Sequence, residues 1–272
     1  MKLFFSGDIF GPAGRKAFRT LLPGVIREFG VDVVVANCEN AATGHGITPD
    51  IYRELVQAGA DCLTSGNHIF DRHEIIDPMD RGDCPLLLRP VNYPSRTPGR
   101  GMTVIDAPGG VKIGVVCVMG AVFMNPVPAD PWEAVDRALE GLRNETPCIL
   151  VDMHAETTSE KQAMGVFCDG RASAVIGTHT HVQTADERIL PGGCAYITDA
   201  GMTGPYDSVI GMNAEISVRR FVRKIPEKGE MAGGGARLCG VVLDIDTATG
   251  QSRSIVRVNR PLDGGREEKK TA

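Results

Sequence analysis

Two histidines separated by one residue follow a short apolar run in the second half of the chain. His179 and His181 come directly after residues 174–176, Ala-Val-Ile, which we expect to form a buried strand. Side chains just beyond a strand end can project toward one point, and neutral imidazole is the commonest side-chain metal ligand. A pair of this kind is equally consistent with surface or core histidines, so its interpretation depends on the other polar residues of the sequence.

Polar side chains also follow other strands that the sequence predicts. Five separate strand ends offer metal-ligand or proton-transfer chemistry, whereas chance would place such residues at one or two. In open α/β sheets, ligands bind outside the carboxyl ends of the strands. We therefore expect one site that contains Asp8, Glu39, Asn40, Asn67, His68, His154, His179 and His181.

The residue types in this set indicate the chemistry. Carboxylates, asparagines and histidines without cysteine suit Mn, Fe or Zn rather than a structural thiolate site. Seven candidate ligands exceed what one ion normally takes, so two ions bridged by one carboxylate, roughly 3.5–4 Å apart, are the economical interpretation. Such a pair can generate a hydroxide and hold the oxygens of a phosphoryl displacement. His68, next to Asn67, could then act as general acid on the leaving oxygen.

The elements that must position these residues alternate between strands and helices over the first two thirds of the chain. Residues 102–106 and 112–119 predict a hairpin, and Pro23 is expected to kink or split the first helix. Strands and helices that alternate early in the chain, followed by hairpins, predict an α/β fold with mixed sheets. We expect one domain over residues 1–262. Buried strands are expected at residues 3–5, 31–36, 61–64, 148–151, 174–176 and 195–198.

The last third of the chain has few helix signals. Residues 216–222, 238–245 and 255–258 are predicted as strands, and those from 216 onward could form a subunit edge in a homo-oligomer. Residues 201–205 are expected to form a loop that walls the pocket. The charged segment 263–272 is expected to be a disordered tail.

Composition excludes several classes of protein. The net charge of -5 gives no electrostatic footprint for duplex nucleic acid, and no apolar run approaches the roughly 20 residues of a membrane span. Asp8 interrupts the apolar start of the chain, so no secretory signal is expected and the protein is predicted to be cytoplasmic. The eight cysteines form no C-x-x-C motif and are expected to be small buried hydrophobes.

The order of the motifs resembles that of the calcineurin-like metallophosphoesterases, and more closely their YmdB-like branch. The resemblance covers most of residues 1–215, and the motifs together are very specific. They are Gly7-Asp8-Ile9, Glu39-Asn40-Ala41-Ala42, Gly46-Ile47-Thr48, Thr64-Ser65-Gly66-Asn67-His68, Arg89-Pro90-Val91-Asn92-Tyr93-Pro94, His154-Ala155-Glu156-Thr157-Thr158-Ser159-Glu160-Lys161 and Gly177-Thr178-His179-Thr180-His181-Val182-Gln183-Thr184-Ala185-Asp186.

The chain departs from the wider superfamily in its first two motifs. The usual Asp-x-His is here Asp8-Ile9-Phe10, and Glu39 stands where an aspartate usually bridges the ions. The resemblance to the narrower branch implies that Asn40 supplies the ligand that the missing histidine would give. It implies a four-layer sandwich of two mixed β-sheets flanked by helices. It also implies two ions, with Fe or Mn favoured over Zn, held by Asp8, Glu39, Asn40 and His181 and by Glu39, Asn67, His154 and His179.

The function that the resemblance implies is hydrolysis of cyclic nucleotides by a metal-activated hydroxide. The substrates would be 2′,3′-cyclic nucleotides, with 3′,5′-cyclic nucleotides as an extension. Two alternatives stay open. The first is a phosphomonoesterase or nucleotidase with the same metal core, and the second is a regulatory nucleotide- or RNA-binding protein whose hydrolysis is incidental.

Single residues also allow structural explanations. Asp8 could cap a helix, Glu39 and Asn40 could be turn residues, and His154 could be a satisfied core histidine. His68 could be a ligand or could support one instead of acting as the acid.

The sequence also predicts roles for residues beside the site. His45, in a glycine-rich loop, is expected to be exposed and to flank the site, and Asp152 and Glu156 to support the ring of His154. Phe10 stands at the position of the missing histidine and could touch the substrate.

Overall fold

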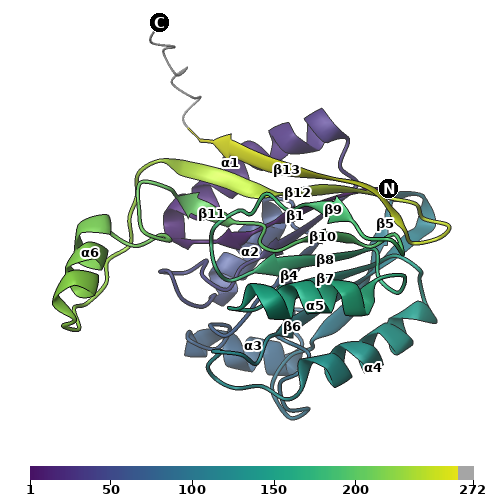
Figure 1. Cartoon of the computed structure of the whole chain (residues 1–272), viewed down its shortest axis with the longest axis horizontal. Helices are drawn as coiled ribbons and strands as arrows, with labels where there is room; N and C mark the ends of the chain where they lie inside the picture. The colour runs from purple at the N-terminus through teal and green to yellow at the C-terminus, as the bar shows by residue number, and fades with distance from the viewer. Residues whose placement is uncertain (263–272) are drawn as a thin grey trace, which may run out of the picture.

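Two mixed β-sheets with flanking helices form the protein in the computed structural model, which describes residues 1–262 (Figure 1). The predicted tail, residues 263–272, lies outside the described residues. The first sheet and its helices consist of β1 (Lys2–Ser6), β2 (Asp8–Ile9), α1 (Gly11–Phe29), β3 (Val33–Asn37), α2 (Pro49–Gln57), β4 (Cys62–Thr64), β11 (Met202–Pro205), β12 (Ala236–Ile245) and β13 (Ser252–Pro261). The remaining elements are η1 (His73–Ile75), α3 (Ile76–Arg81), β5 (Met102–Ala107), η2 (Pro108–Gly110), β6 (Val111–Met119), α4 (Pro131–Arg143), β7 (Ile149–His154), α5 (Thr158–Cys168), β8 (Ala174–Thr178), β9 (Arg188–Ile189), β10 (Ala195–Ile197) and α6 (Ala214–Arg223).

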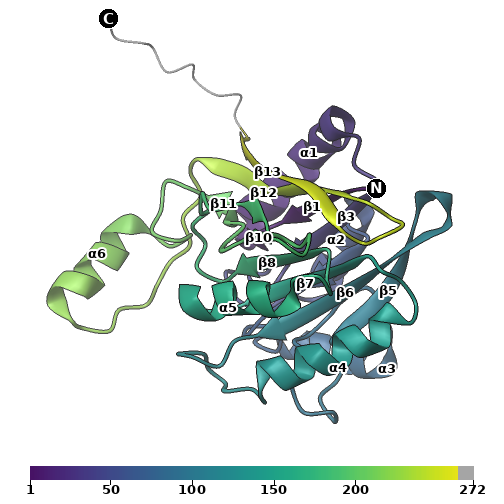
Figure 2. The same ribbon diagram turned by 45° about the vertical axis from the view of Figure 1, so that its right-hand side comes forward.

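The two sheets confirm the predicted four-layer architecture. The first sheet has seven strands in the order β2-β11-β12-β1-β3-β4, with β13 paired to β12. The second has six strands in the order β5-β6-β7-β8-β10-β9. The hairpin expected around η2 is present, because β5 and β6 pair in antiparallel register. Helix α1 packs on the first sheet, while α4 and α5 pack on the second (Figures 1 and 2).

The apolar core lies in layers that the alternation of side chains along the strands creates. Phe5 and Val35 point between the sheets, where they meet Leu150 and Ile176 of the second sheet. Phe4, next to Phe5, packs instead among the residues of α1 and α2. Strands buried on both faces read as continuous apolar runs, which is why the sequence shows them clearly. The layer shared by both sheets supports the prediction of one domain, which remains a prediction.

Helix α1 runs unbroken through Pro23, so a split at this residue is wrong, while the kink expected as its alternative stays a prediction. A proline inside a helix removes one hydrogen bond to the carbonyl four residues earlier, that of Arg19. Both Arg19 and Pro23 lie on the exposed side of α1, where water can satisfy that carbonyl. Phe18 and Leu22 stay on the buried face, so burial of the apolar stripe offsets the lost hydrogen bond.

Two segments of the last third differ from the sequence prediction. Residues 216–222 were expected to be a strand and form helix α6, because Asn213 caps it by accepting from the Ile216 N–H at 3.1 Å. The β-branched residues in this segment favour strands, but a single buried face at Ile216 and Ser217 suits a helix. Residues 202–205 were expected to be a loop and form β11, which pairs with β2 and β12.

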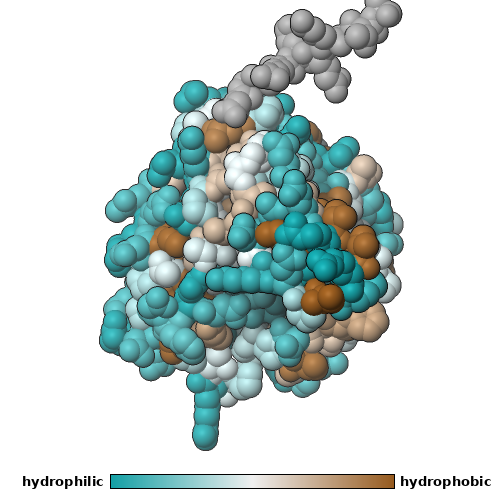
Figure 3. All heavy atoms as spheres, turned by 90° about the vertical axis from the view of Figure 1, so that its left-hand side faces the viewer, coloured by the Kyte–Doolittle hydropathy of each residue, from teal (hydrophilic) through white to brown (hydrophobic). Residues whose placement is uncertain are grey.

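Helix α6 stands away from both sheets, at the left of Figure 1 and again in Figure 2. It exposes Val218, Phe221 and Val222, and the face of the molecule that it occupies shows apolar residues among hydrophilic ones (Figure 3). The homo-oligomer remains a prediction. Of the three late segments proposed as its edge, residues 216–222 form a helix, while the other two lie in β12 and β13. Among residues 1–262, none of the helices has the length and apolar character that crossing a membrane requires.

The carboxyl ends of the parallel strands lie at one edge of each sheet. In the first sheet β1, β3 and β4 are parallel, with Ser6 beside Ala36 and Asn37 beside Thr64. In the second sheet β6, β7 and β8 are parallel, and His154 at the end of β7 lies beside Thr178. The loops that leave these ends carry the predicted site.

Backbone contact between β8 and the end of β10 generates a stability prediction. A Cβ on Gly177 would lie 1.7 Å from the carbonyl oxygen of Thr198, so Gly177→Ala must displace backbone. We expect it to lower the free energy of unfolding by about 2 kcal/mol or more, as overpacking does. Gly24→Ala in α1 is the control, because nothing lies within 4 Å of its new Cβ. It should raise the free energy by about 0.5–1 kcal/mol. Urea unfolding followed by circular dichroism measures both, and a Gly177→Ala protein as stable as wild type contradicts the close approach.

Candidate metal centre

The predicted site residues come together where the two sheets meet at the carboxyl ends of their strands. Most of these side chains are buried, while Asn67, His68 and His179 are partly exposed. The proximity expected from the strand ends is therefore present in the structure. Asp8 lies in β2, Glu39 and Asn40 follow β3, Asn67 and His68 follow β4, His154 ends β7, and His179 and His181 follow β8.

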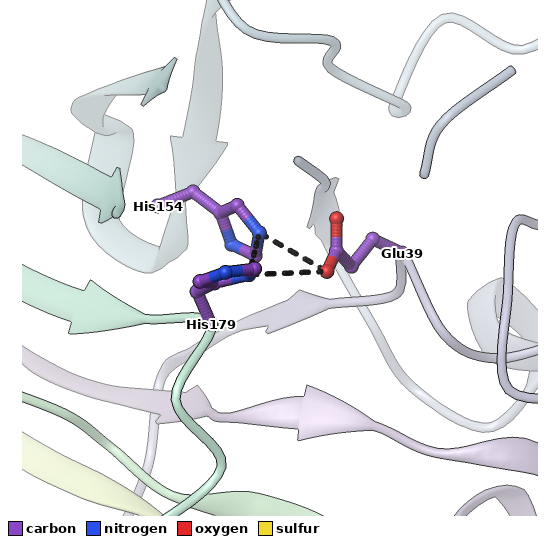
Figure 4. Close-up of side chains that lie close together, drawn as sticks. All are labelled: Glu39, His154 and His179. Carbon is purple, nitrogen blue, oxygen red and sulfur yellow. Dashed lines mark hydrogen bonds and ion pairs between the residues drawn. The ribbon is translucent and has the colours of Figure 1, made fainter. Parts of the chain in front are cut away.

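Glu39, His154 and His179 form the centre of this group (Figure 4). The Nε2 of His154 lies 3.0 Å from the Oε1 of Glu39 and 3.1 Å from the Nδ1 of His179. The Nδ1 of His179 lies 4.0 Å from the same Oε1. One carboxylate oxygen and two ring nitrogens thus point at one small volume, from one loop of each sheet and the end of β7.

Hydrogen bonds fix which nitrogen of His154 carries the proton. Thr178 donates its hydroxyl to Asp152 at 2.7 Å, so the Thr178 oxygen accepts from the Nδ1–H of His154 at 2.9 Å. Burial lowers the pKa of His154 to about 4, so the ring is neutral near pH 7 and its Nε2 is a lone pair. That lone pair faces the Glu39 oxygen at 3.0 Å and the Oδ1 of Asn67 at 3.2 Å, two oxygens that can only accept.

His181 shows the same arrangement on the other side of the site. Its Nδ1 lies 2.9 Å from the carbonyl oxygen of Ile210, which only accepts, so Nδ1 carries the proton. Burial lowers the pKa of His181, which keeps the ring neutral. Its Nε2 lone pair faces the Oδ1 of Asn40 at 3.2 Å. Because the amide nitrogen of Asn40 donates to the carbonyl of Gly44 at 2.9 Å, the oxygen is fixed toward His181.

Asp8 is a buried carboxylate with one oxygen left over. Its Oδ2 accepts the backbone N–H of His179 at 3.1 Å, while its Oδ1 has no hydrogen-bond partner within residues 1–262. Burial, with the charges of Asp199 and Glu39, raises the pKa of Asp8 well above its usual range. The Oε1 of Glu39 also lacks a hydrogen-bond partner among the described residues. Crowded carboxylates of this kind call for a positive charge between them.

The residues present therefore fit metal ions. Each unpaired acceptor is a carboxylate oxygen, an amide oxygen or an imidazole lone pair, which are the donors that Mn, Fe and Zn take in proteins. A cation would turn every acceptor–acceptor contact described above into a ligand pair. Asp8 does not cap a helix, because Phe10 is the residue that precedes α1 as its cap residue.

A buried ion pair that the sequence prediction missed shapes the histidine loop. Lys161 and Asp199 are fully buried, 2.8 Å apart. Asp199 also accepts the backbone N–H and the hydroxyl of Thr180, at 3.0 and 2.6 Å. Since Thr180 lies between His179 and His181, the pair anchors the segment that carries both rings. In the sequence, Lys161 is recognisable only as part of a family motif. No local sequence pattern identifies Asp199 as a residue of the site.

The backbone of the two histidines is itself unusual. His179 and His181 have φ values of 95° and 64°, in the left-handed region that residues other than glycine seldom adopt. Each such residue costs on the order of 1–3 kcal/mol and persists where surrounding contacts impose it, often at functional sites. The Asp199 contacts and the Ile210 carbonyl supply that constraint here.

Neighbouring residues depart in part from their expected roles. Asp152 supports His154 as expected, but through Thr178 rather than directly. Glu156 contacts His179 instead of His154, with its Oε2 3.2 Å from the Nε2 of that ring. Phe10 is buried, with its ring edge-on to His181 at a centroid distance of 5.6 Å, so it packs behind a candidate ligand.

His68 lies at the rim of the group with one nitrogen free for chemistry. Its backbone N–H donates to the Oε2 of Glu39 at 3.2 Å, which fixes the turn after β4. Its Nδ1 lies 2.7 Å from the Oδ2 of Asp71, a partner that the sequence prediction did not include. Because Asp71 holds Nδ1, Nε2 is the nitrogen that can give a proton to a bound molecule.

The family follows from comparison of the whole chain with known proteins. A family model described as YmdB-like protein matches residues 4–258. The chain belongs to the YmdB-like family. The resemblance seen in the motifs is therefore confirmed, and it extends past residue 215 through the last strands.

Named relatives give this family its biochemical setting. The chain is 46% identical, over 95% of its length and 96% of the relative's, to a Bacillus subtilis protein named 2′,3′-cyclic-nucleotide 2′-phosphodiesterase. It is 35% identical, over 97% of its length and 94% of the relative's, to a Mycoplasma genitalium protein named putative phosphatase/phosphodiesterase. A solved Mycoplasma pneumoniae structure, described as a novel phosphatase, has a TM-score of 0.89 at 33% identity, covering 98% of this chain and 95% of that one.

The hydroxyl between Asp152 and His154 generates a prediction about metal affinity. Thr178→Val removes the acceptor that holds the His154 Nδ1–H, and we expect Mn²⁺ affinity to fall about 10- to 100-fold, as loss of such support does elsewhere. Thr178→Ser keeps the hydroxyl and should bind Mn²⁺ nearly as tightly as wild type. Equilibrium dialysis of metal-stripped protein measures both. Equal affinity for the valine and serine variants contradicts a role for this hydroxyl.

Proposed function

We propose that this protein is a metal-dependent phosphodiesterase that hydrolyses 2′,3′-cyclic nucleotides. The observation that carries the proposal is the set of buried, unprotonated acceptors that face one another at the sheet edges. The hydrolase class is that of the named Bacillus subtilis relative, and the substrate follows the same name. The proposal extends to hydrolysis of 3′,5′-cyclic nucleotides.

Two ions would share Glu39. The first set of ligands is Asp8, Glu39, Asn40 and His181, and the second is Glu39, Asn67, His154 and His179. The first set has mainly oxygen donors together with one imidazole nitrogen. This combination of oxygen and nitrogen ligands favours Mn or Fe, with Zn as the alternative. When bound, such ions lower the pKa of a water molecule and stabilise negative charge on the phosphate oxygens.

The chain's own residues do the remaining work. The Lys161–Asp199 pair and Thr178 hold the histidine rings in place before any ligand arrives, so little reorganisation is needed. In the named relative's reaction the bond from phosphorus to the 2′ oxygen breaks. We assign His68 as the acid that gives its Nε2 proton to this leaving oxygen, while Asp71 holds Nδ1 and sets the direction of the ring.

Other functions are compatible with the same core and are separated by turnover. The relatives named phosphatase/phosphodiesterase favour a phosphomonoesterase as the second candidate. A regulatory nucleotide- or RNA-binding protein would bind nucleotide with useful affinity even when His68 is changed and turnover is lost. The substrate partner in each case is a small phosphate ester or nucleotide.

Removal of one proposed ligand gives a direct count of the ions. Asn40→Ala removes the oxygen that faces His181, and we expect the Mn²⁺ content of purified, dialysed protein to fall from about two ions per chain to about one. Asn40→Asp keeps an oxygen donor and should retain both. Elemental analysis against protein concentration makes the measurement. Two tightly bound ions in the alanine variant contradict the assignment of Asn40.

Leaving-group dependence tests the function and the acid together. Metal-stripped protein should hydrolyse 2′,3′-cyclic AMP only after Mn²⁺ is added, and chromatography should show the nucleoside 3′-monophosphate. We expect His68→Ala to lower kcat for this substrate about 10²- to 10⁴-fold, the usual contribution of a general acid. The loss should be much smaller with bis(p-nitrophenyl) phosphate, because nitrophenolate leaves without a proton.

A monoester, p-nitrophenyl phosphate, is measured beside the diesters. Preference for it would promote the phosphatase, and no turnover with bound Mn²⁺ would promote the binding protein. Equal losses on both diesters in His68→Ala would show that His68 acts before the bond breaks.

A further inference from the structure

A second cluster of metal-binding side chains lies beside the candidate metal centre and uses none of its proposed ligands. His45, His68 and Asp71 each offer one donor atom, and these atoms all lie within 4.8 Å of one another. The rings of His45 and His68 have centroids 4.7 Å apart, and the Nδ1 of His68 is 2.7 Å from the Oδ2 of Asp71. His45 and Asp71 are exposed and His68 is partly exposed, so solvent reaches the cluster.

Backbone packing holds the two segments of the cluster together. His45 lies between Gly44 and Gly46, whose φ values of 84° and 71° allow a tight loop. A Cβ on Gly46 would lie 3.0 Å from the backbone nitrogen of Arg72 and 3.3 Å from the carbonyl oxygen of His68. The Nε of Arg72 also donates to the carbonyl of His45 at 3.3 Å. His45 is therefore fixed against the turn that carries His68 and Asp71.

Two imidazoles and one carboxylate form a common ligand set of zinc sites that have three protein ligands and a water molecule in the fourth position. If His68 acts only as an acid, Asp71 is sufficient to orient its ring. The His45 ring is not needed for that role. We propose that His45, His68 and Asp71 bind a further transition-metal ion, with Zn²⁺ as the best match, and that this ion inhibits hydrolysis.

The inhibition rests on the proposed function of His68. A ring with an ion on one nitrogen cannot become the imidazolium, so its other nitrogen is a much weaker acid toward the leaving oxygen. The cluster would make turnover sensitive to free zinc while the ions at the main centre stay in place. The site has three protein ligands, one of them shared with catalysis, so it would bind zinc reversibly.

Zinc binding and inhibition are measured on protein loaded with excess Mn²⁺, in wild type and in two variants. His45→Gln removes one ligand of the cluster, while His73→Gln removes an exposed histidine outside it. We expect wild type and His73→Gln to bind one Zn²⁺ per chain more than His45→Gln does in equilibrium dialysis. Half-inhibition of 2′,3′-cyclic AMP hydrolysis should need at least about tenfold more zinc in His45→Gln, with its turnover in Mn²⁺ alone unchanged.

A spectroscopic arm does not depend on turnover. Co²⁺ in place of Zn²⁺ should give an additional tetrahedral visible band in wild type that His45→Gln lacks. Equal zinc binding by wild type and His45→Gln overturns the site. A His45-dependent ion that leaves turnover unchanged overturns the inhibition. If no protein hydrolyses any ester but the extra ion still depends on His45, the proposed function fails and the site stands.

Discussion

Acceptor atoms face acceptor atoms at the candidate metal centre, and the rest of the structure depends on that constraint. Neutral His154 points a lone pair at Glu39, and neutral His181 points one at Asn40, at 3.0 and 3.2 Å. Such contacts are unfavourable by themselves. Burial and the charges of Asp199 and Glu39 also raise the pKa of Asp8 well above its usual range. The sheets, the buried ion pair and the strained loop all keep these groups close together. A fold built only for stability would place donors there instead.

Contacts of the two histidine rings with their surroundings determine which ring nitrogen carries the proton. Thr178 and the Ile210 carbonyl both take the Nδ1 proton of a ring, so both lone pairs face inward. The same task is done by a side chain in one case and by backbone in the other. Lys161 balances the charge of Asp199. Among the described residues, the basic groups within 4 Å of Asp8 and Glu39 are histidines, and none is a lysine or an arginine.

Local sequence rules predicted the inner residues and missed much of what holds them. Asp8, Glu39, His154 and the two histidines after β8 were found because strand ends are visible as apolar runs followed by polar residues. The contact of Asp199 with Lys161 joins residues 38 apart, and no local pattern encodes it. Helix α6 was predicted as a strand because β-branched residues outweighed a cap at Asn213 that only the fold makes visible. Pro23 does not end the helix. The free-energy cost of a proline inside a helix depends on whether water can reach the carbonyl that loses its hydrogen bond.

The span of the chain that builds the centre has a consequence for biosynthesis. The Asp8 carboxylate meets the backbone of His179 across 171 residues, and β1 pairs with β12 still later in the chain. A ribosome delivers about 5–20 residues per second, so the first carboxylate waits many seconds for its partners. No ion can nucleate the early part of the chain, because a full ligand set does not yet exist. The apolar sheets must therefore assemble before these residues can meet, and binding of the proposed ions would follow that assembly.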